Sequence, residues 1–113
     1  MLYHSGINKI ILVGQIATEP FLQNEKIKAY HFTLLTKEIH DKQGVQVEHL
    51  EYHRIILPFY TVPQGLNLQK GLLVYLEGKI HTFAWTDEQN IKRYDTEILG
   101  TQINCLLDAK NSV

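Results

Sequence analysis

The chain has 113 residues, which suffice for one domain that buries a core without metal or disulfide support. Apolar residues make up 44% of it and charged residues 20%, as in an ordinary soluble globular protein, and no apolar run approaches the ~20 residues of a membrane span. The formal net charge of −1 excludes any argument from bulk basicity, so a nucleic-acid-binding role must rest on where the cations lie.

The first part of the chain is expected to form two strands. Residues 8–17 are a β-branched apolar run, which predicts a strand buried on both faces over part of its length and bent at Gly14. Residues 21–27 are a short connection. Residues 28–38 alternate in character, and the large apolar side chains of one set mark the face toward the core: Tyr30, Phe32 and Leu34.

The middle of the chain predicts a third strand and a short helix. Residues 39–46 are a polar loop. The third strand covers residues 47–59, and Pro58 blocks its continuation because proline cannot donate to a strand ladder. Residues 61–69 could form a short helix that begins at Pro63.

The most informative stretch is residues 71–100, which predict two long strands joined by a polar tip. Because side chains alternate along a strand, one face can be buried, and it consists of Val74, Leu76, Ile80 and Ala84. The other face carries aromatic rings beside cations: Tyr75, Glu77, Lys79, His81, Phe83 and Trp85. Gly78 lies in mid-strand, where a residue without Cβ permits a sharp bend or bulge. An exposed aromatic stripe of this kind suits a surface that binds something flat.

The last predicted strand, residues 91–107, is long and is expected to kink at Gly100. It contains the single cysteine of the chain, Cys105, which cannot form an internal disulfide. Since Cys105 lies in an apolar run, we expect a buried and inert thiol, which fits a reducing compartment.

The order of elements is therefore three strands, a short helix and two strands. Five strands without a crossover helix between each pair favour an antiparallel barrel over a parallel sheet. A helix between strands 3 and 4 is the arrangement of the OB-fold, an all-β, five-stranded Greek-key barrel that binds oligonucleotides or oligosaccharides. We predict a single OB-fold domain over residues 1–113, with an ordered core at about residues 7–107.

A set of short stretches in order along the chain carries a family likeness. They read NKIILVG at residues 8–14, EP at 19–20, YHRIIL at 52–57, KG at 70–71, VYLEG at 74–78, WTD at 85–87 and RYDTEI at 93–98. Together they resemble bacterial single-stranded DNA-binding proteins of the homotetrameric OB-fold type. The resemblance implies a non-catalytic, cytoplasmic homo-oligomer, a tetramer in preference to a dimer. It would bind single-stranded DNA without sequence preference in DNA replication, recombination and repair, with no cofactor, membrane or small-molecule substrate.

Exposed rings are the first candidates for such a site, because bases stack on aromatic side chains whatever their identity, at ~1–3 kcal/mol per base. The resemblance puts Trp85 and Tyr52 at base-stacking positions, with Phe59 or Tyr60 near a third and Phe83 as an extra ring. Each main candidate has a structural alternative: Trp85 as a cap on the barrel end, Tyr52 as a cross-strand pair, and Phe83 as a contact with a neighbouring subunit.

Phosphates need cations along the groove, and the release of their counterions makes binding salt-dependent. The candidate phosphate ligands are Arg54, Lys42, Lys79 and Lys92. Lys70 could instead bond the end of the short helix, and Arg93 could pair with Asp87. The basic cluster that the family carries before the tryptophan is replaced here by HTFA at residues 81–84, so we expect weaker binding, or a shallower salt slope, than in a basic relative.

The resemblance also implies subunit pairing through the first strand, with Asn8, Ile10, Leu12 and His53 as candidate interface residues. The alternative is that the first strand is simply buried in its own barrel. Full-length relatives carry a flexible tail with an acidic tip that recruits other proteins. This sequence has no acidic tail, which indicates either a truncated chain or a tail-less variant with a narrower role.

Other functions find less support in the residues. The histidines show no CxxC or HExxH spacing, and His49 and His53 would lie ~13 Å apart on one strand face, too far for one tetrahedral metal site. No nucleophile with a neighbouring base can be placed, so we expect no enzyme. Two alternatives stay open: a primosome-like or element-borne OB paralogue with weak DNA binding and mainly protein partners, and a structural interaction module that binds no nucleic acid.

Overall fold

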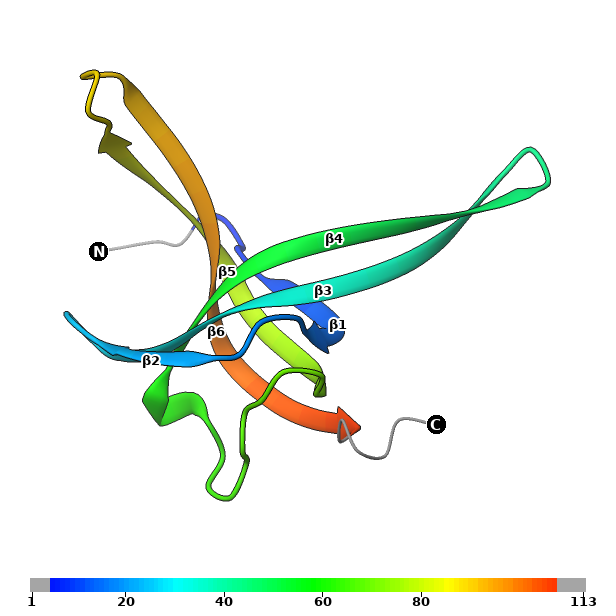
Figure 1. Cartoon of the computed structure of the whole chain (residues 1–113), viewed down its shortest axis with the longest axis horizontal. Coiled ribbons are helices and arrows are strands. Elements are labelled where there is room, and N and C mark those ends of the chain that lie inside the picture. The colour runs from blue at the N-terminus through cyan, green and yellow to red at the C-terminus, as the bar shows by residue number, and fades with distance from the viewer. Residues whose placement is uncertain (1–4, 108–113) are drawn as a thin grey trace.

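The computed structural model describes residues 5–107 as strands with one short 3-10 helix (Figure 1). The elements in chain order are β1 (Ile10–Ile16), β2 (Phe21–Asn24), β3 (Lys28–Lys42), β4 (Val45–Pro58), η1 (Phe59–Thr61), β5 (Leu73–Thr86) and β6 (Lys92–Leu107). Residues 1–4 and 108–113 lie outside the described residues, and with them the predicted chain end without an acidic tail. Within residues 5–107, no helix has the length and apolar character needed to cross a membrane.

The strands form one sheet that closes on itself. Their order is β1-β5-β6-β4-β3-β2, and β1 also pairs with β3 at Gln15 and Ile16, which joins the five long strands into a barrel. Neighbouring strands are antiparallel except β4 and β6, which run parallel at Ile55 and Ile56. This arrangement confirms the predicted five-stranded OB-fold barrel, to which β2 adds a short edge beside β3.

The core is built from every second residue of the long strands. In β3, Phe32 and Leu34 are buried, as the alternation predicted, so the side chains between them point outward. In β4, Ile55 and Leu57 are fully buried and leave Arg54 on the outer face. The remaining members of the core cluster are Ile16, Leu72, Val74, Leu76, Ile98 and Ile103. Burying an aliphatic side chain of this size stabilises the fold by about 1.5–3 kcal/mol.

Two hairpins extend beyond the barrel (Figure 1). β3 and β4 pair from Ala29 and Pro58 as far as Lys42 and Val45, so most of the loop predicted at residues 39–46 is strand. Residues 37–50 are exposed on both faces, and we call them the β3–β4 arm. Residues 79–97 form the second extension, the β5–β6 arm.

Three expectations about local structure differ from the fold. The segment between β4 and β5 contains the 3-10 turn η1 and no α-helix, and Gly65 within it has a positive φ of 88°. Ile80 and Ala84, predicted to face the core, are exposed, because the β5–β6 arm continues past the barrel that would cover them. Cys105, predicted to be buried, is exposed near the end of β6.

Two glycines allow strands to approach closely. A Cβ at Gly14 would overlap the carbonyl oxygen of Leu35 where β1 meets β3. A Cβ at Gly78 would overlap the carbonyl oxygen of Leu99, and the β5–β6 register shifts between Glu77 and Gly78. The ladder irregularity predicted at Gly78 is therefore present, and the extra residue of the bulge is Thr101 of β6, opposite Glu77 and Gly78.

Candidate nucleic-acid interface

A groove of about 610 Å³ lies on the outer face of the barrel. Its lining comes from β2, β3, β4, β6 and the loop before β2: Thr18, Glu19, Phe21, His31, Phe32, Thr33, Arg54, Ile56 and Glu97. We call this surface the groove. Since its residues come from segments far apart in the sequence, the folded barrel alone brings them together.

Strand pairing sets the lining of the groove in rows. His31 pairs with Phe21 on one side and with Ile56 on the other, and Thr33 pairs with Arg54. Partners directly opposite in neighbouring strands point to the same face of the sheet. The loop before β2 is tied down as well, because the backbone N–H of Thr33 donates to Thr18 Oγ1 at 2.9 Å. The backbone ladder and this hydrogen bond therefore shape the groove.

The aromatic stripe predicted on the second hairpin continues from the groove along the β5–β6 arm. His81 pairs with Glu97, which lines the groove, and His81 Nδ1 lies 3.2 Å from Glu97 Oε1. The Phe83 ring stacks on His81 with centroids 6.0 Å apart and an interplanar angle of 21°. Trp85 follows on the same face and is 43% exposed.

Two carboxylates fix the outer end of this arm. Trp85 Nε1 donates to Asp95 Oδ2 at 2.9 Å, which ties the indole by its edge. Asp87 accepts from the backbone N–H of Ile91 and from Arg93 Nε at 2.8 Å, and these bonds, the one from Ile91 first, hold the pKa of Asp87 below its ordinary value. Trp85 thus lies out on the arm and does not cap the barrel, and Arg93 forms the ion pair anticipated as its alternative role.

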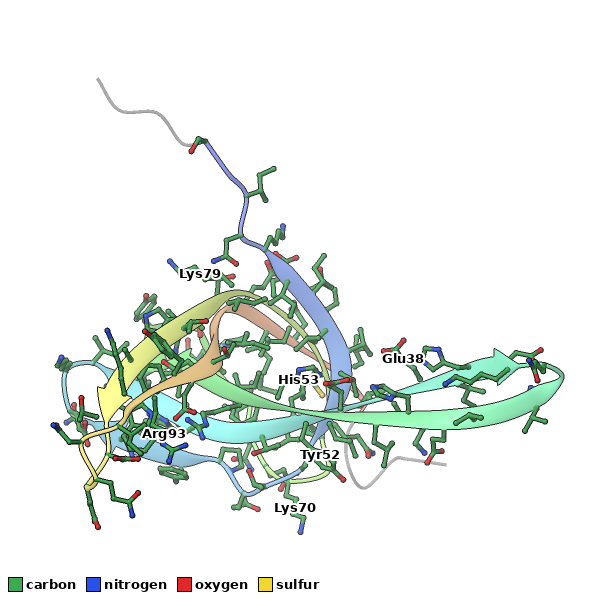
Figure 2. The ribbon with its side chains drawn as sticks, turned by 90° about the horizontal axis from the view of Figure 1, so that it is seen from above. Glu38, Tyr52, His53, Lys70, Lys79 and Arg93 are labelled. Atoms are coloured by element: carbon green, nitrogen blue, oxygen red, sulfur yellow. The ribbon has the colours of Figure 1, made fainter. Side chains whose placement is uncertain are left out.

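Tyr52 lies on the outer face of β4, two residues before Arg54. Its side chain is 64% exposed, and it pairs across the ladder with Leu35 of β3. Figure 2 shows Tyr52 and Arg93 in the half of the view away from Lys79.

Phe59 does not line the groove. Its ring stacks on Tyr30 with centroids 6.0 Å apart, and Lys28 Nζ lies 4.0 Å from the Phe59 centroid. Tyr30 belongs to the inward-facing set of β3, so Phe59 lies toward the open end of the barrel. Its role as a stacking ring stays a prediction and requires that the nucleic acid pass around this end.

The predicted phosphate ligands are dispersed. Only Arg54 lines the groove. Lys42 borders a separate hollow of about 260 Å³ on the β3–β4 arm. Lys92 pairs with Thr86, the residue after Trp85, so it lies on the face of the β5–β6 arm opposite to that of Trp85. Lys79 lies on β5 two residues before His81 and does not line the groove, and Figure 2 shows it on the side of the view away from Tyr52. None of these four cations forms an ion pair with a residue among those described, so all four remain available to an anion.

The groove itself is not basic. Glu19 and Glu97 line it together with Arg54, which gives two carboxylates for one guanidinium. The side chain of Glu97 is only 16% exposed, so its charge is weakly screened by solvent. A negatively charged group that enters deeply is therefore disfavoured, whereas a neutral group is not.

One aromatic pair at the groove was not predicted from the sequence. Phe21 of β2 and His31 of β3 stack with centroids 5.4 Å apart and an interplanar angle of 18°, and Phe21 is 54% exposed. We expected a connection at residues 21–27 because a strand of four residues is too short to show alternation. The available signal was a large apolar residue directly after Pro20.

The predicted interface residues lie on or near β1. Asn8 fixes the start of the strand, because its side chain donates to the carbonyl of Ile80 at 2.8 Å and accepts from its N–H at 2.9 Å. Ile10 and Leu12 pack against the core of their own barrel. His53 Nε2 bonds Thr36 Oγ1 at 2.9 Å.

The apolar side chains of β1 that alternate with Ile10 and Leu12 are exposed. Ile11 is 54% and Val13 50% exposed, so the first strand is not buried on both faces within one chain. Together with Leu12 and His53 they line a hollow of about 310 Å³ between β1 and the β3–β4 hairpin. This hollow is the part of β1 that a second protein surface could cover.

Metal ligation finds no support in the described part of the chain. Among residues 5–107, no group of three or more histidine, cysteine, aspartate or glutamate side chains is placed to hold a metal ion. His40 and His49 meet edge to face with centroids 5.7 Å apart, and His49 Nε2 is taken up by Glu51 at 2.7 Å. The bond from His49 also lowers the pKa of Glu51.

The fold and the sequence both match known proteins. In the sequence, residues 7–106 match the model of the single-strand binding protein family. Among solved structures, the SSB of Plasmodium falciparum in complex with ssDNA matches with 26% identity and a TM-score of 0.75, over 93% of this chain and 99% of that chain.

Two further structures share the fold at lower identity. A deletion mutant of the single-stranded DNA binding protein from Thermus aquaticus matches with 20% identity and a TM-score of 0.78, over 96% of this chain and 54% of that one. The small single-stranded DNA-binding protein from Streptomyces coelicolor matches with 17% identity and a TM-score of 0.60, over 88% of this chain and 94% of that one. On its sequence match over nearly all the described residues, the chain belongs to the single-strand binding protein family.

Proposed function

We propose that this protein binds single-stranded DNA without reading its sequence and serves DNA replication, recombination and repair. The observation that carries the proposal is the row of exposed rings that leads from the groove along the β5–β6 arm, in a chain of the single-strand binding protein family. The Plasmodium relative, which shares the whole domain, is a complex with ssDNA, and this supports the same ligand here.

Base stacking supplies most of the affinity in this proposal. Trp85 and Tyr52 are the principal rings, and Phe83 extends the stripe between Trp85 and the groove. Phe59 would take part where the strand passes the end of the barrel. Each stacked base contributes about 1–3 kcal/mol, and every base offers a π-face, so the sum is large and tolerant of sequence.

Phosphate contacts are few and spread out. Arg54 is the cation beside the stacked bases, whereas Lys42, Lys79 and Lys92 would meet the backbone of a longer strand that wraps around the subunit. Their freedom from ion pairs with described residues supports this role. Binding should therefore depend on salt less steeply than in a protein whose groove is lined with lysines.

The active unit is proposed to be a homo-oligomer, a tetramer in preference to a dimer. β1 pairs with β3 only at Gln15 and Ile16, so among the described strands its earlier residues leave one backbone edge open. An open edge beside exposed Ile11 and Val13 favours pairing with a second copy. Asn8, Ile10, Leu12 and His53 would position and flank that contact.

The remaining features of the proposal follow from the family. Its members are DNA-binding proteins rather than enzymes, and we infer that this single OB-fold domain has no catalytic role and needs no cofactor. We place its action in the cytoplasm, where single-stranded DNA of a bacterium-like replication system is exposed. A small-molecule substrate has no part in the mechanism.

Fluorescence of Trp85, the single tryptophan, tests the proposal directly. Titration with oligo-dT should quench its emission, and added salt should reverse the quenching. Trp85→Leu should weaken binding by about 5- to 150-fold, as expected for one stacked base, whereas Trp85→Phe keeps a ring and should lose less. If polarisation detects binding of the oligonucleotide but the Trp85 emission is not quenched, Trp85 does not stack on the bound bases. Silence toward every oligonucleotide would reject the function and favour a protein-interaction role.

A further inference from the structure

The Phe21–His31 pair lines the groove, and the family resemblance described above assigns no role to either residue. Building on the proposed function, we propose that these two rings form an additional base-stacking site, which binds one nucleobase of single-stranded DNA against the floor of the groove. The site is distinct from the Trp85 stripe because it belongs to β2 and β3, whereas the stripe belongs to β5.

The backbone holds the two rings in register. β2 pairs with β3 from Phe21 opposite His31 to Asn24 opposite Lys28. The ring planes lie within 18° of parallel at 5.4 Å, so the two side chains support each other as one unit. Pro20 precedes Phe21 and fixes its own φ, which limits the freedom of the chain that leads into β2. A ring that is both 54% exposed and held in place loses little entropy when it stacks on a base.

The charges around the pair select the part of a nucleotide that can enter. Ile56, only 8% exposed, forms an apolar floor beside His31. Glu19 and Glu97 stand on the walls and repel a phosphate that approaches this floor. A neutral, flat base meets no such penalty, and Arg54, which also lines the groove, can bind the phosphate that follows it or donate to a base carbonyl. The chemistry of the groove therefore favours a base inside and the backbone outside.

Substitution at Phe21 tests this site. Phe21→Leu keeps apolar volume but removes the π-face, and it should weaken binding of a short oligo-dT by about 5- to 150-fold, whereas Phe21→Trp should retain affinity. Leu22→Ala is the matched control, because Leu22 is the next residue of β2 and points to the other face, opposite Tyr30. It should leave affinity unchanged.

Photochemical crosslinking of the wild-type protein tests the same site without any substitution. Oligonucleotides carrying 5-iododeoxyuridine, irradiated in the complex and mapped by peptide mass spectrometry, should link to Phe21 or His31. Unchanged affinity of Phe21→Leu, or crosslinks that avoid both residues while Trp85 is still quenched, would overturn this site and leave the proposed function standing. If wild-type protein binds no oligonucleotide, the proposed function fails and this site fails with it.

Discussion

Arg54 offers the sharpest test of how this protein handles phosphate charge. Arg54 lines the groove together with two carboxylates, and it forms no ion pair with a described residue. The variant Arg54→Gln removes the charge and keeps a polar side chain of similar reach. A short oligonucleotide of about 8 nucleotides, near the site size of a single OB-fold, should contact the groove and little else.

The size of the effect follows from counterion release. Each phosphate contact on a single strand contributes about −0.7 to the slope of log affinity against log salt. One contact thus weakens binding about 2.6-fold when salt rises fourfold, whereas four contacts weaken it about 50-fold. The short oligonucleotide should show the first value with wild-type protein and almost no salt dependence with Arg54→Gln. A strand several times longer should approach the second value if Lys42, Lys79 and Lys92 also contact it.

The assay is polarisation of labelled oligo-dT of both lengths between about 50 and 200 mM salt, a range over which such slopes are well defined. Lys9→Gln serves as the control, because Lys9 is already paired with Glu77 at 3.3 Å, lies directly before β1 and does not line the groove. If Arg54→Gln leaves the slope for the short oligonucleotide unchanged, the phosphates do not follow the groove and the reasoning fails. If the wild-type protein binds the short oligonucleotide with the salt dependence expected for four phosphate contacts, the lysines are not as dispersed along the DNA path as we infer.

Two further predictions concern stability. Gly14→Ala should destabilise the fold by about 1–3 kcal/mol in urea unfolding, because the added Cβ overlaps the carbonyl of Leu35 at the closure of the barrel; Gly6→Ala, with open space around it, should not. Asp87 has a lowered pKa, so its contribution is present above the unfolded value near 4 and is lost as pH falls through the folded value. On acidification from neutral pH to below about pH 4, the melting temperature of the wild type should therefore fall further than that of Asp87→Asn; parallel curves would contradict this.

The barrel was predictable because its strands obey a period of two. Phe32 and Leu34 stand on the buried face of β3, as their alternation with polar neighbours indicated. The irregularity beside Gly78 was predictable because a residue without Cβ in mid-strand permits a bend or bulge, although the extra residue itself belongs to β6. Trp85 was placed correctly on an exposed face by the same alternation. These features depend on local sequence, and each survives in the structure.

What the sequence could not give depends on contacts between distant segments. The alternation that buries Val74 and Leu76 continues to Ile80, yet Ile80 is 49% exposed because no strand covers the arm there. Phe21 reaches the groove only because β2 pairs with β3. Ile11 shows a third limit of prediction from sequence. An apolar run indicates that a strand face is buried, but it does not indicate whether the same barrel or a second copy of the chain buries it.

The balance of charge in the groove explains how a protein with a net charge of −1 can bind a polyanion. Glu19 and Glu97 outnumber Arg54, so the electrostatic term near the floor of the groove is small or unfavourable. Affinity must then come from rings, whose stacking energy does not depend on released counterions. Such a protein should bind less tightly than a basic relative at low salt but lose less of its affinity as salt rises. The departures from the basic family pattern therefore predict a different salt response with the same ligand, and the position of the rings, rather than the number of lysines, determines where the strand runs.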